Sequence, residues 1–164
     1  MTGVQTCALP ICSGGYGAMM HALMHPDIWS AAASHSGDMG FELLFASDFA
    51  HTLRRIAKHG GTIKSFMTAF EASSKPAGDD IHALMILAMA ASYDPDPDAY
   101  LGIRLPVTMD TCEMDKAAWA RWMKWDPLEL VETRGEGLKS MKALYIDCGD
   151  IDQYNLVYGA RRMT

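Results

Sequence analysis

The 164-residue chain lacks the features that mark several large classes of protein. No apolar run approaches the ~20 residues that a helix needs to span a bilayer, and the N-terminus lacks the basic start and sustained apolar core of a signal peptide. Basic residues are in deficit: 14 lysines and arginines face 20 aspartates and glutamates, for a formal net charge of -6. This balance argues against nucleic acid or an anionic membrane as partner. The sequence assigns no compartment, with the cytoplasm slightly favoured.

Cysteine is scarce as well. The chain has four, Cys7, Cys12, Cys112 and Cys148. They form no CxxC pair, so neither a disulfide framework nor a structural zinc site is predicted. His21 and His25 stand one helical turn apart, but the glutamate of an HExxH motif and a third ligand are missing. The "DPDPD" stretch, Asp94–Asp98, lacks the glycine and terminal glutamate of a calcium loop, which favours a solvated turn. We therefore predict no metal and no cofactor.

What is present is an α/β pattern in the first and last parts of the chain. A helix is predicted over 13–25, ended by Pro26. The small-residue run from Trp29 to Asp38 predicts an inner parallel strand, with His35, Ser36 and Gly37 at its carboxyl end. The apolar run Lys142–Gly149 predicts another strand, followed by a loop and a helix. These patterns predict an α/β fold with parallel strands and flanking helices.

The middle of the chain, from about residue 41 to residue 130, has apolar residues at helical spacing. Asp79 or Asp80 is expected to cap one helix, and Asp126 with Pro127 to begin another. We interpret this block as a helical insertion in the α/β domain. Three of its aromatic side chains are expected to fill a core rather than line a pocket: Phe45, Trp119 and Trp122.

A turn rich in small residues, "PICSGG" from Pro10 to Gly15, leads into the first helix. In a nucleophile elbow, Gly-x-Ser-x-Gly, the nucleophile sits in a strained turn between strand and helix, so residues two positions away must be small. With Cys12 at the nucleophile position, Gly14 fits the last place, whereas Pro10 breaks the first and cysteine replaces serine. From these residues alone, an ordinary glycine-rich turn remains the alternative.

Two longer segments resemble one family. "SGGYGAMMHALMHPDIWSAAASHSGDMGFE" is similar to the segment around the nucleophile in the α/β-hydrolase family of esterases that includes the esterase D type, enterochelin esterases and mycolyltransferases. "LYIDCGDIDQYNLVYGARRM" resembles the acid-bearing segment of that family. The resemblance implies a partial α/β-hydrolase fold over 12–164. It implies a nucleophile at Cys12, where the family has serine, the Ser13 backbone N–H in the oxyanion hole, and the acid at Asp152.

The cysteine at position 12 and the first eleven residues share one explanation. "GVQTCALPI", Gly3–Ile11, resembles translated sequencing-adapter DNA of the kind found at the start of metagenomic open reading frames. The adapter bases GCTCTTCCGATC encode Ala-Leu-Pro-Ile, and the T that follows them turns an AGC or AGT serine codon into a cysteine codon. We therefore expect residues 1–11 to be non-native. Because the last helix stops soon after it starts, we expect the domain to be truncated at both ends.

An acyl-transfer triad of this fold has the chain order nucleophile, acid, histidine. Asp152 follows a strand end, where open α/β sheets place catalytic loops, and Asp147 and Asp150 are the alternatives. All six histidines precede Asp152, so the base is expected beyond residue 164. His35, at a strand end, either lines the pocket or is hydrogen-bonded within the scaffold.

Two functions are compatible with these patterns. The first is a fragment of a serine-type esterase acting on a small-molecule carboxylic ester or thioester through an acyl-enzyme, inactive in this form because its histidine is missing. Transfer of the acyl group to another alcohol is a variant of the same chemistry. The second is a non-catalytic α/β-hydrolase-like binding or scaffold protein.

Overall fold

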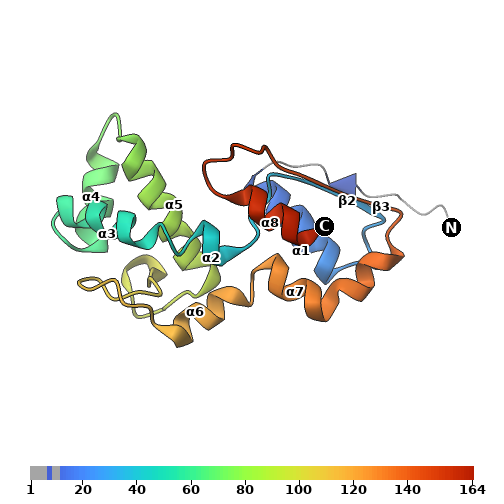
Figure 1. The fold of residues 1–164 in the computed structure, drawn as a ribbon. Helices are drawn as coiled ribbons and strands as arrows, with labels where there is room; N and C mark the ends of the chain where they lie inside the picture. The colour runs from blue at the N-terminus through green and yellow to red at the C-terminus, as the bar shows by residue number, and fades with distance from the viewer. Residues whose placement is uncertain (1–6, 9–11) are drawn as a thin grey trace. The chain divides into compact units, whose positions relative to one another are not determined.

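The computed structural model describes the backbone of residues 7–8 and the whole of residues 12–164 (Figure 1). It consists of two units: the residues up to Leu44 together with Lys124–Thr164 form the α/β unit, and Phe45–Met123 form the helical unit. The elements of the α/β unit are β1 (Cys7–Ala8), α1 (Ser13–Met24), β2 (Ala31–His35), α2 (Phe41–Leu44), α7 (Pro127–Arg134), the 3-10 helix η2 (Gly135–Ser140), β3 (Ala143–Asp147) and α8 (Leu156–Met163).

The strands form a parallel sheet in the order β1-β2-β3. β2 pairs with β3 from Ala31 opposite Ala143 to His35 opposite Asp147, and Figure 1 shows these two strands side by side. The prediction of a mixed α/β fold with an inner parallel strand is therefore confirmed. Because the strands are parallel, their carboxyl ends lie at the same end of the sheet.

Helix α1 packs against β2, and α8 packs against β3. The helix predicted over 13–25 ends at Met24, one residue earlier than expected and two before Pro26, whose ring cannot continue a helix. A small apolar core joins these elements. It contains Met19, Met39 and Leu128, with Ile146 and Met163 packed against it.

Strand β3 is more exposed than its apolar sequence suggests. Leu144 and Tyr145 have 38% and 55% of their surface exposed. Among the described strands, β3 pairs only with β2 and so forms an edge of the sheet. Of its side chains, Ile146 packs on the apolar core.

The helical unit is built from α3 (Phe49–Lys58), α4 (Ile63–Ala72), α5 (Gly78–Tyr93), the 3-10 helix η1 (Tyr100–Gly102) and α6 (Lys116–Met123). Its core centres on Trp122, which is fully buried. The Trp122 ring lies 5.3–5.9 Å, centroid to centroid, from four other rings, those of Phe45, Phe49, Tyr93 and Trp119. The expectation that aromatic residues fill a core is confirmed for Phe45 and Trp122, which are buried, whereas Trp119 is half-buried and contacts the rings of Phe49 and Trp122. Among the described residues, none of the helices combines the length and apolar character needed to cross a bilayer.

Two of the predicted helix starts have different outcomes. Asp126 caps α7, accepting a hydrogen bond from the Leu128 N–H at 3.0 Å, and Pro127 is its first residue, as predicted. The prediction that Asp79 or Asp80 caps a helix is wrong, because α5 begins at Gly78 with Ala77 at the cap position.

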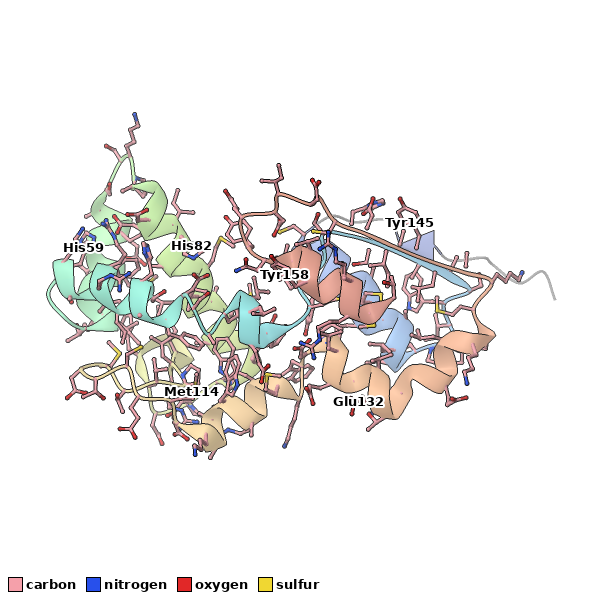
Figure 2. All side chains as sticks on the ribbon, viewed as in Figure 1. His59, His82, Met114, Glu132, Tyr145 and Tyr158 are labelled. Carbon is pink, nitrogen blue, oxygen red and sulfur yellow. The ribbon has the colours of Figure 1, made fainter. Side chains whose placement is uncertain are left out.

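Asp80 instead joins α5 to α3 in the helical unit. Its Oδ1 accepts hydrogen bonds from Arg55 Nη2 at 2.7 Å and Nε at 2.9 Å, and lies 3.1 Å from His59 Nε2. A second pair, His82 Nε2 to Asp48 Oδ2 at 2.9 Å, adds to this connection (Figure 2). The carboxylate of Asp80 is thus used for a long-range ion pair, which the local pattern does not reveal.

The "DPDPD" segment is also more than the solvated turn expected from the sequence. Asp94 is buried, with 7% of its surface exposed. Its carboxylate accepts hydrogen bonds from Arg121 Nε at 2.6 Å and from Arg104 Nη2 at 3.0 Å. Because the Asp94 carboxylate pairs with two guanidinium groups, the segment connects the end of α5, α6 and the loop between them.

Candidate active-site edge

Cys12 occupies a strained turn directly before α1. Its backbone angles, φ 58° and ψ -127°, lie in a sparsely populated region that costs of order 1–3 kcal/mol for a residue other than glycine. The Cys12 N–H donates a hydrogen bond to the carbonyl oxygen of His35, at the end of β2, with a length of 2.8 Å. The side chain makes no capping hydrogen bond to α1 among the described residues. Pro10 and Ile11, the first two places of the elbow motif, lie outside the described residues.

Close backbone contact between α1 and the end of β2 supports this turn. A Cβ atom on Gly15 would lie 2.8 Å from the His35 carbonyl oxygen and 3.0 Å from the Cα of Gly37. A Cβ atom on Gly37 would in turn lie 2.7 Å from the Gly15 carbonyl carbon. The distances of 2.8 and 2.7 Å, both to backbone atoms, are too short for any side chain, so the helix can approach the strand end only with glycine at both positions. Small residues are therefore a steric requirement at this turn.

Ser13 is the first residue of α1 and is exposed. The N–H groups in the first turn of a helix have no carbonyl partner within the helix, and the helix dipole adds partial positive charge there. The Ser13 N–H follows Cys12 directly in the chain. A negative charge that develops on an oxygen bound near Cys12 can therefore be stabilised by hydrogen bonds of this kind.

Asp152 lies in the loop between β3 and α8 and is half-buried. Its Oδ1 accepts hydrogen bonds from the N–H groups of Tyr154 at 3.0 Å and Leu156 at 2.9 Å. These two bonds fix the orientation of the carboxylate at the start of α8. Its other oxygen, Oδ2, accepts no hydrogen bond from the described part of the chain, which leaves it open to a further donor.

His35 and Asp147, two further candidate site residues, lie at the carboxyl ends of β2 and β3 and contact one another. His35 Nδ1 lies 2.8 Å from Asp147 Oδ1, and the Tyr145 hydroxyl donates to Asp147 Oδ2 at 3.3 Å (Figure 2). The two side chains remain 37% and 45% exposed. Of the two alternatives for His35, the structure therefore shows the hydrogen-bonded scaffold residue. Asp147 is a paired structural carboxylate.

Asp38 is the residue that the sequence analysis missed. It follows Gly37 at the end of β2 and has only 7% of its surface exposed. Burial, and secondarily the negative charge of Asp152, raise the pKa of the Asp38 carboxyl to about 6. Within the described residues it has no cationic or hydrogen-bonding partner. A carboxylate placed directly after the glycine that ends a predicted inner strand was the available signal.

The thiol of Cys148 lies just after β3. Burial raises the pKa of Cys148 above its usual value, and the charges of Asp152 and Asp147 act in the same direction, against a hydrogen bond to Ser36 that lowers it. This thiol is therefore protonated at neutral pH and a weak nucleophile. Cys12, Cys112 and Cys148 are all free of disulfide bonds.

A cavity of about 170 Å³ lies beside this end of β3, against α8. It is lined by Ile146, Asp147, Cys148, Asp150, Val157, Ala160, Arg161 and Thr164. Asp150, the third candidate for the acid, thus lines this cavity, whereas neither Cys12 nor Asp152 does. In residues 7–8 and 12–164, no group of three or more histidine, cysteine, aspartate or glutamate side chains is arranged to hold a metal ion.

The parallel sheet therefore brings the Cys12 backbone against the end of β2, and puts Asp38 within electrostatic reach of Asp152. Among the described residues, no hydrogen bond joins the Cys12 and Asp152 side chains, and no histidine is hydrogen-bonded to either of them. Comparison with models of protein families and with curated proteins found no match to this chain.

Proposed function

We propose that the chain carries part of the acyl-transfer site of a serine-type carboxylic ester or thioester hydrolase with a partial α/β-hydrolase fold. In this proposal Cys12 stands at the nucleophile position, the Ser13 N–H stabilises the oxyanion, and Asp152 orients a histidine that lies beyond residue 164. The observation that carries the proposal is the backbone of Cys12, with φ 58° and ψ -127° between a strand and a helix. A strained residue of this kind points its side chain away from both flanking elements.

The proposed reaction proceeds by nucleophilic attack. The oxygen or sulfur at position 12 adds to the acyl carbon while its proton passes to the histidine, and the carbonyl oxygen becomes an oxyanion near the N-terminus of α1. Collapse of this intermediate expels the alcohol or thiol, which takes the proton from the histidine. Water then repeats the sequence on the acyl-enzyme and releases the carboxylic acid. With another alcohol in place of water, the same steps transfer the acyl group.

Asp152 supports this role through its geometry. One carboxylate oxygen is held by two backbone N–H groups, and the other is open to a donor from outside the described residues. A carboxylate so fixed can hold an imidazole in one tautomer and stabilise its protonated form. Without that imidazole, we expect the chain as it stands to be nearly inactive.

One observation favours a second candidate function, a non-catalytic binding or scaffold protein. The carboxylate of Asp152 accepts a hydrogen bond from the N–H of Leu156, the first residue of α8, and His35 at the end of β2 is paired with Asp147. Both residues thus have structural roles that need no reaction. A scaffold of this kind keeps the hydrolase-like turn as a folding element, with no acylation at position 12.

Site-specific acylation separates the two functions. The chain is incubated with 4-nitrophenyl acetate, with and without free imidazole as a substitute base, and acetylation of each cysteine is followed by peptide mass spectrometry. The hydrolase proposal predicts that imidazole accelerates acetylation of Cys12 more than that of Cys112 or Cys148, which serve as internal controls. If Cys12 is acetylated no faster than these two, the turn is structural and the scaffold function stands.

A further inference from the structure

A groove lies between α1 and α7 of the α/β unit. It encloses about 240 Å³ and is lined by Met20, Met24, Lys124, Trp125, Leu130 and Arg134. Met20 and Met24 lie in the second half of α1, roughly 10 and 16 Å along the helix axis from Ser13 at a rise of 1.5 Å per residue. The groove is therefore separate from the turn at Cys12.

Two kinds of side chain line this groove. Four are apolar, and two of these are methionines, whose flexible thioethers adapt to ligands of irregular shape. The other two are the cations Lys124 and Arg134, and no acidic side chain is among the lining residues. This positive rim belongs to a chain whose formal net charge is -6.

The two cations are also available for a ligand. Arg55, Arg104 and Arg121, in the helical unit, each have an aspartate partner within 3.0 Å. Lys124 and Arg134 form no ion pair with the described residues. An anion that binds beside them therefore does not have to displace an existing carboxylate.

We infer that this groove binds a soluble medium-chain carboxylate. The alkyl chain lies against the methionines and Leu130, and the carboxylate contacts Lys124 and Arg134. The groove is partly open to solvent, and its volume of about 240 Å³ leaves room for an alkyl chain of several methylenes, so octanoate rather than acetate is the probe. The inference rests on the lining residues and the size of the groove, and is independent of any reaction at Cys12.

The methionines provide a direct readout. In the 164-residue chain labelled with ¹³C at methionine methyl groups, carboxylates from butanoate to decanoate are titrated at up to about 10 mM. We expect the Met20 and Met24 resonances to shift, and those of Met85 and Met109, exposed in the helical unit, to stay unchanged. Affinity should rise about fourfold per methylene up to about eight carbons and then level off.

Two variants test the charged end. Arg134→Gln and Lys124→Gln should each weaken octanoate binding by up to about fivefold and leave binding of the neutral alcohol octanol unchanged. Arg162→Gln, at an exposed position of α8, is the matched control and should bind octanoate like the parent chain. Leu130→Trp, which fills the groove and keeps both cations, should abolish the Met20 and Met24 shifts.

Several results would overturn the inference. One is the absence of any Met20 or Met24 shift with octanoate, and another is equal affinity for butanoate and octanoate. Equal losses of octanoate and octanol binding in Arg134→Gln would show that the charge is not recognised. If the two resonances respond to dilution or only to anionic lipid vesicles, a second copy of the chain or a membrane occupies the groove instead.

Discussion

The two units of the chain treat their buried carboxylates differently. In the helical unit, Asp80 and Asp94 face guanidinium groups, and these partners lower the pKa of both carboxyls despite the opposing effect of burial. In the α/β unit, the buried carboxylates face backbone N–H groups or no partner at all. Asp126 accepts three N–H bonds, whereas Asp38 has no partner among the described residues and a pKa raised to about 6.

This difference distinguishes carboxylates that are paired with a cation from carboxylates that are not. A carboxylate paired with arginine joins two helices, and its negative charge is already neutralised. A buried carboxylate with neither a cation nor a hydrogen-bond donor beside it lowers the stability of the fold, so it persists where something other than stability maintains it. By this criterion Asp38, at the carboxyl end of the sheet with Cys12 and Asp152, is the better candidate for chemistry.

The largest expected effect is the loss of esterase activity that follows from the missing histidine. The 164-residue chain should hydrolyse 4-nitrophenyl acetate no faster than its Cys12→Ala variant, because loss of the general base from a triad costs roughly 10⁶-fold in kcat. Steady-state release of nitrophenolate measures this, with Cys112→Ala as the control. Turnover clearly above that of Cys12→Ala would mean that the described residues already contain a base, and the assignment of a missing histidine would be wrong.

The second prediction concerns Asp126, a carboxylate whose hydrogen-bond donors are backbone N–H groups. Asp126 is 1% exposed, and its oxygens accept hydrogen bonds from the N–H groups of Gly40, Phe41 and Leu128 at 3.0, 2.7 and 3.0 Å. Asp126→Ala leaves these donors without a partner and should lower the free energy of unfolding by about 3–5 kcal/mol. Urea denaturation followed by circular dichroism measures the loss. A cost below 1 kcal/mol would contradict the described network, and Asp126→Asn should cost less than alanine.

Asp38→Asn tests the carboxylate without a partner. Since its pKa is raised on folding, the folded chain holds the proton more tightly than the unfolded chain. Asp38 therefore makes stability fall as pH rises from about 4 to about 6, with no further change above. Asparagine should remove this decline and raise stability at pH 7.5 by at most about 3 kcal/mol, with little change at pH 4. Thermal unfolding at the two pH values measures it, and equal effects at both would remove Asp38 from the candidate site.

The smallest effect is expected at Asp94, whose contribution to stability depends on pH in the opposite direction to that of Asp38. The arginine partners hold the pKa of the Asp94 carboxyl below its usual value, so Asp94 stabilises the chain above about pH 4, and this contribution is lost as pH falls further. Asp94→Asn should therefore cost about 1–2 kcal/mol at pH 7, because water screens the partly exposed guanidinium groups. The cost should shrink at pH 3. Measuring the stability of Asp94→Asn and Asp38→Asn in one pH series tests the contrast between the two units, because the effects of the two variants should change with pH in opposite ways.

Local sequence signals predicted the elements of the fold well. Pro26 limited α1, Asp126 with Pro127 marked the start of α7, and the small-residue run before His35 predicted a parallel strand that the structure places in the middle of the sheet. Each of these features acts within a few residues of the chain. Their physical causes, a blocked hydrogen bond, a cap and a buried strand, can therefore be read without knowledge of the fold.

Features that depend on distant residues could not be predicted in this way. The bonds from Asp126 to Gly40 and Phe41 span more than eighty positions, and Asp80 was misread as a cap because Arg55 is not its neighbour in sequence. The raised pKa of Asp38 depends on burial by the folded chain. At the candidate site, the sequence indicated a tight turn at Cys12, but its backbone angles required the structure.

The central claim is that positions 12 and 152 act together on one substrate. The rate of imidazole-dependent acetylation of Cys12 in Asp152→Asn, compared with Asp150→Asn, tests this most directly. Asparagine keeps an oxygen that can accept the two N–H bonds at the start of α8, so the fold is preserved while the charge that orients imidazole is lost. We predict a fall of about tenfold in Asp152→Asn and no change in Asp150→Asn. Equal rates in the two variants and the parent chain would contradict the claim.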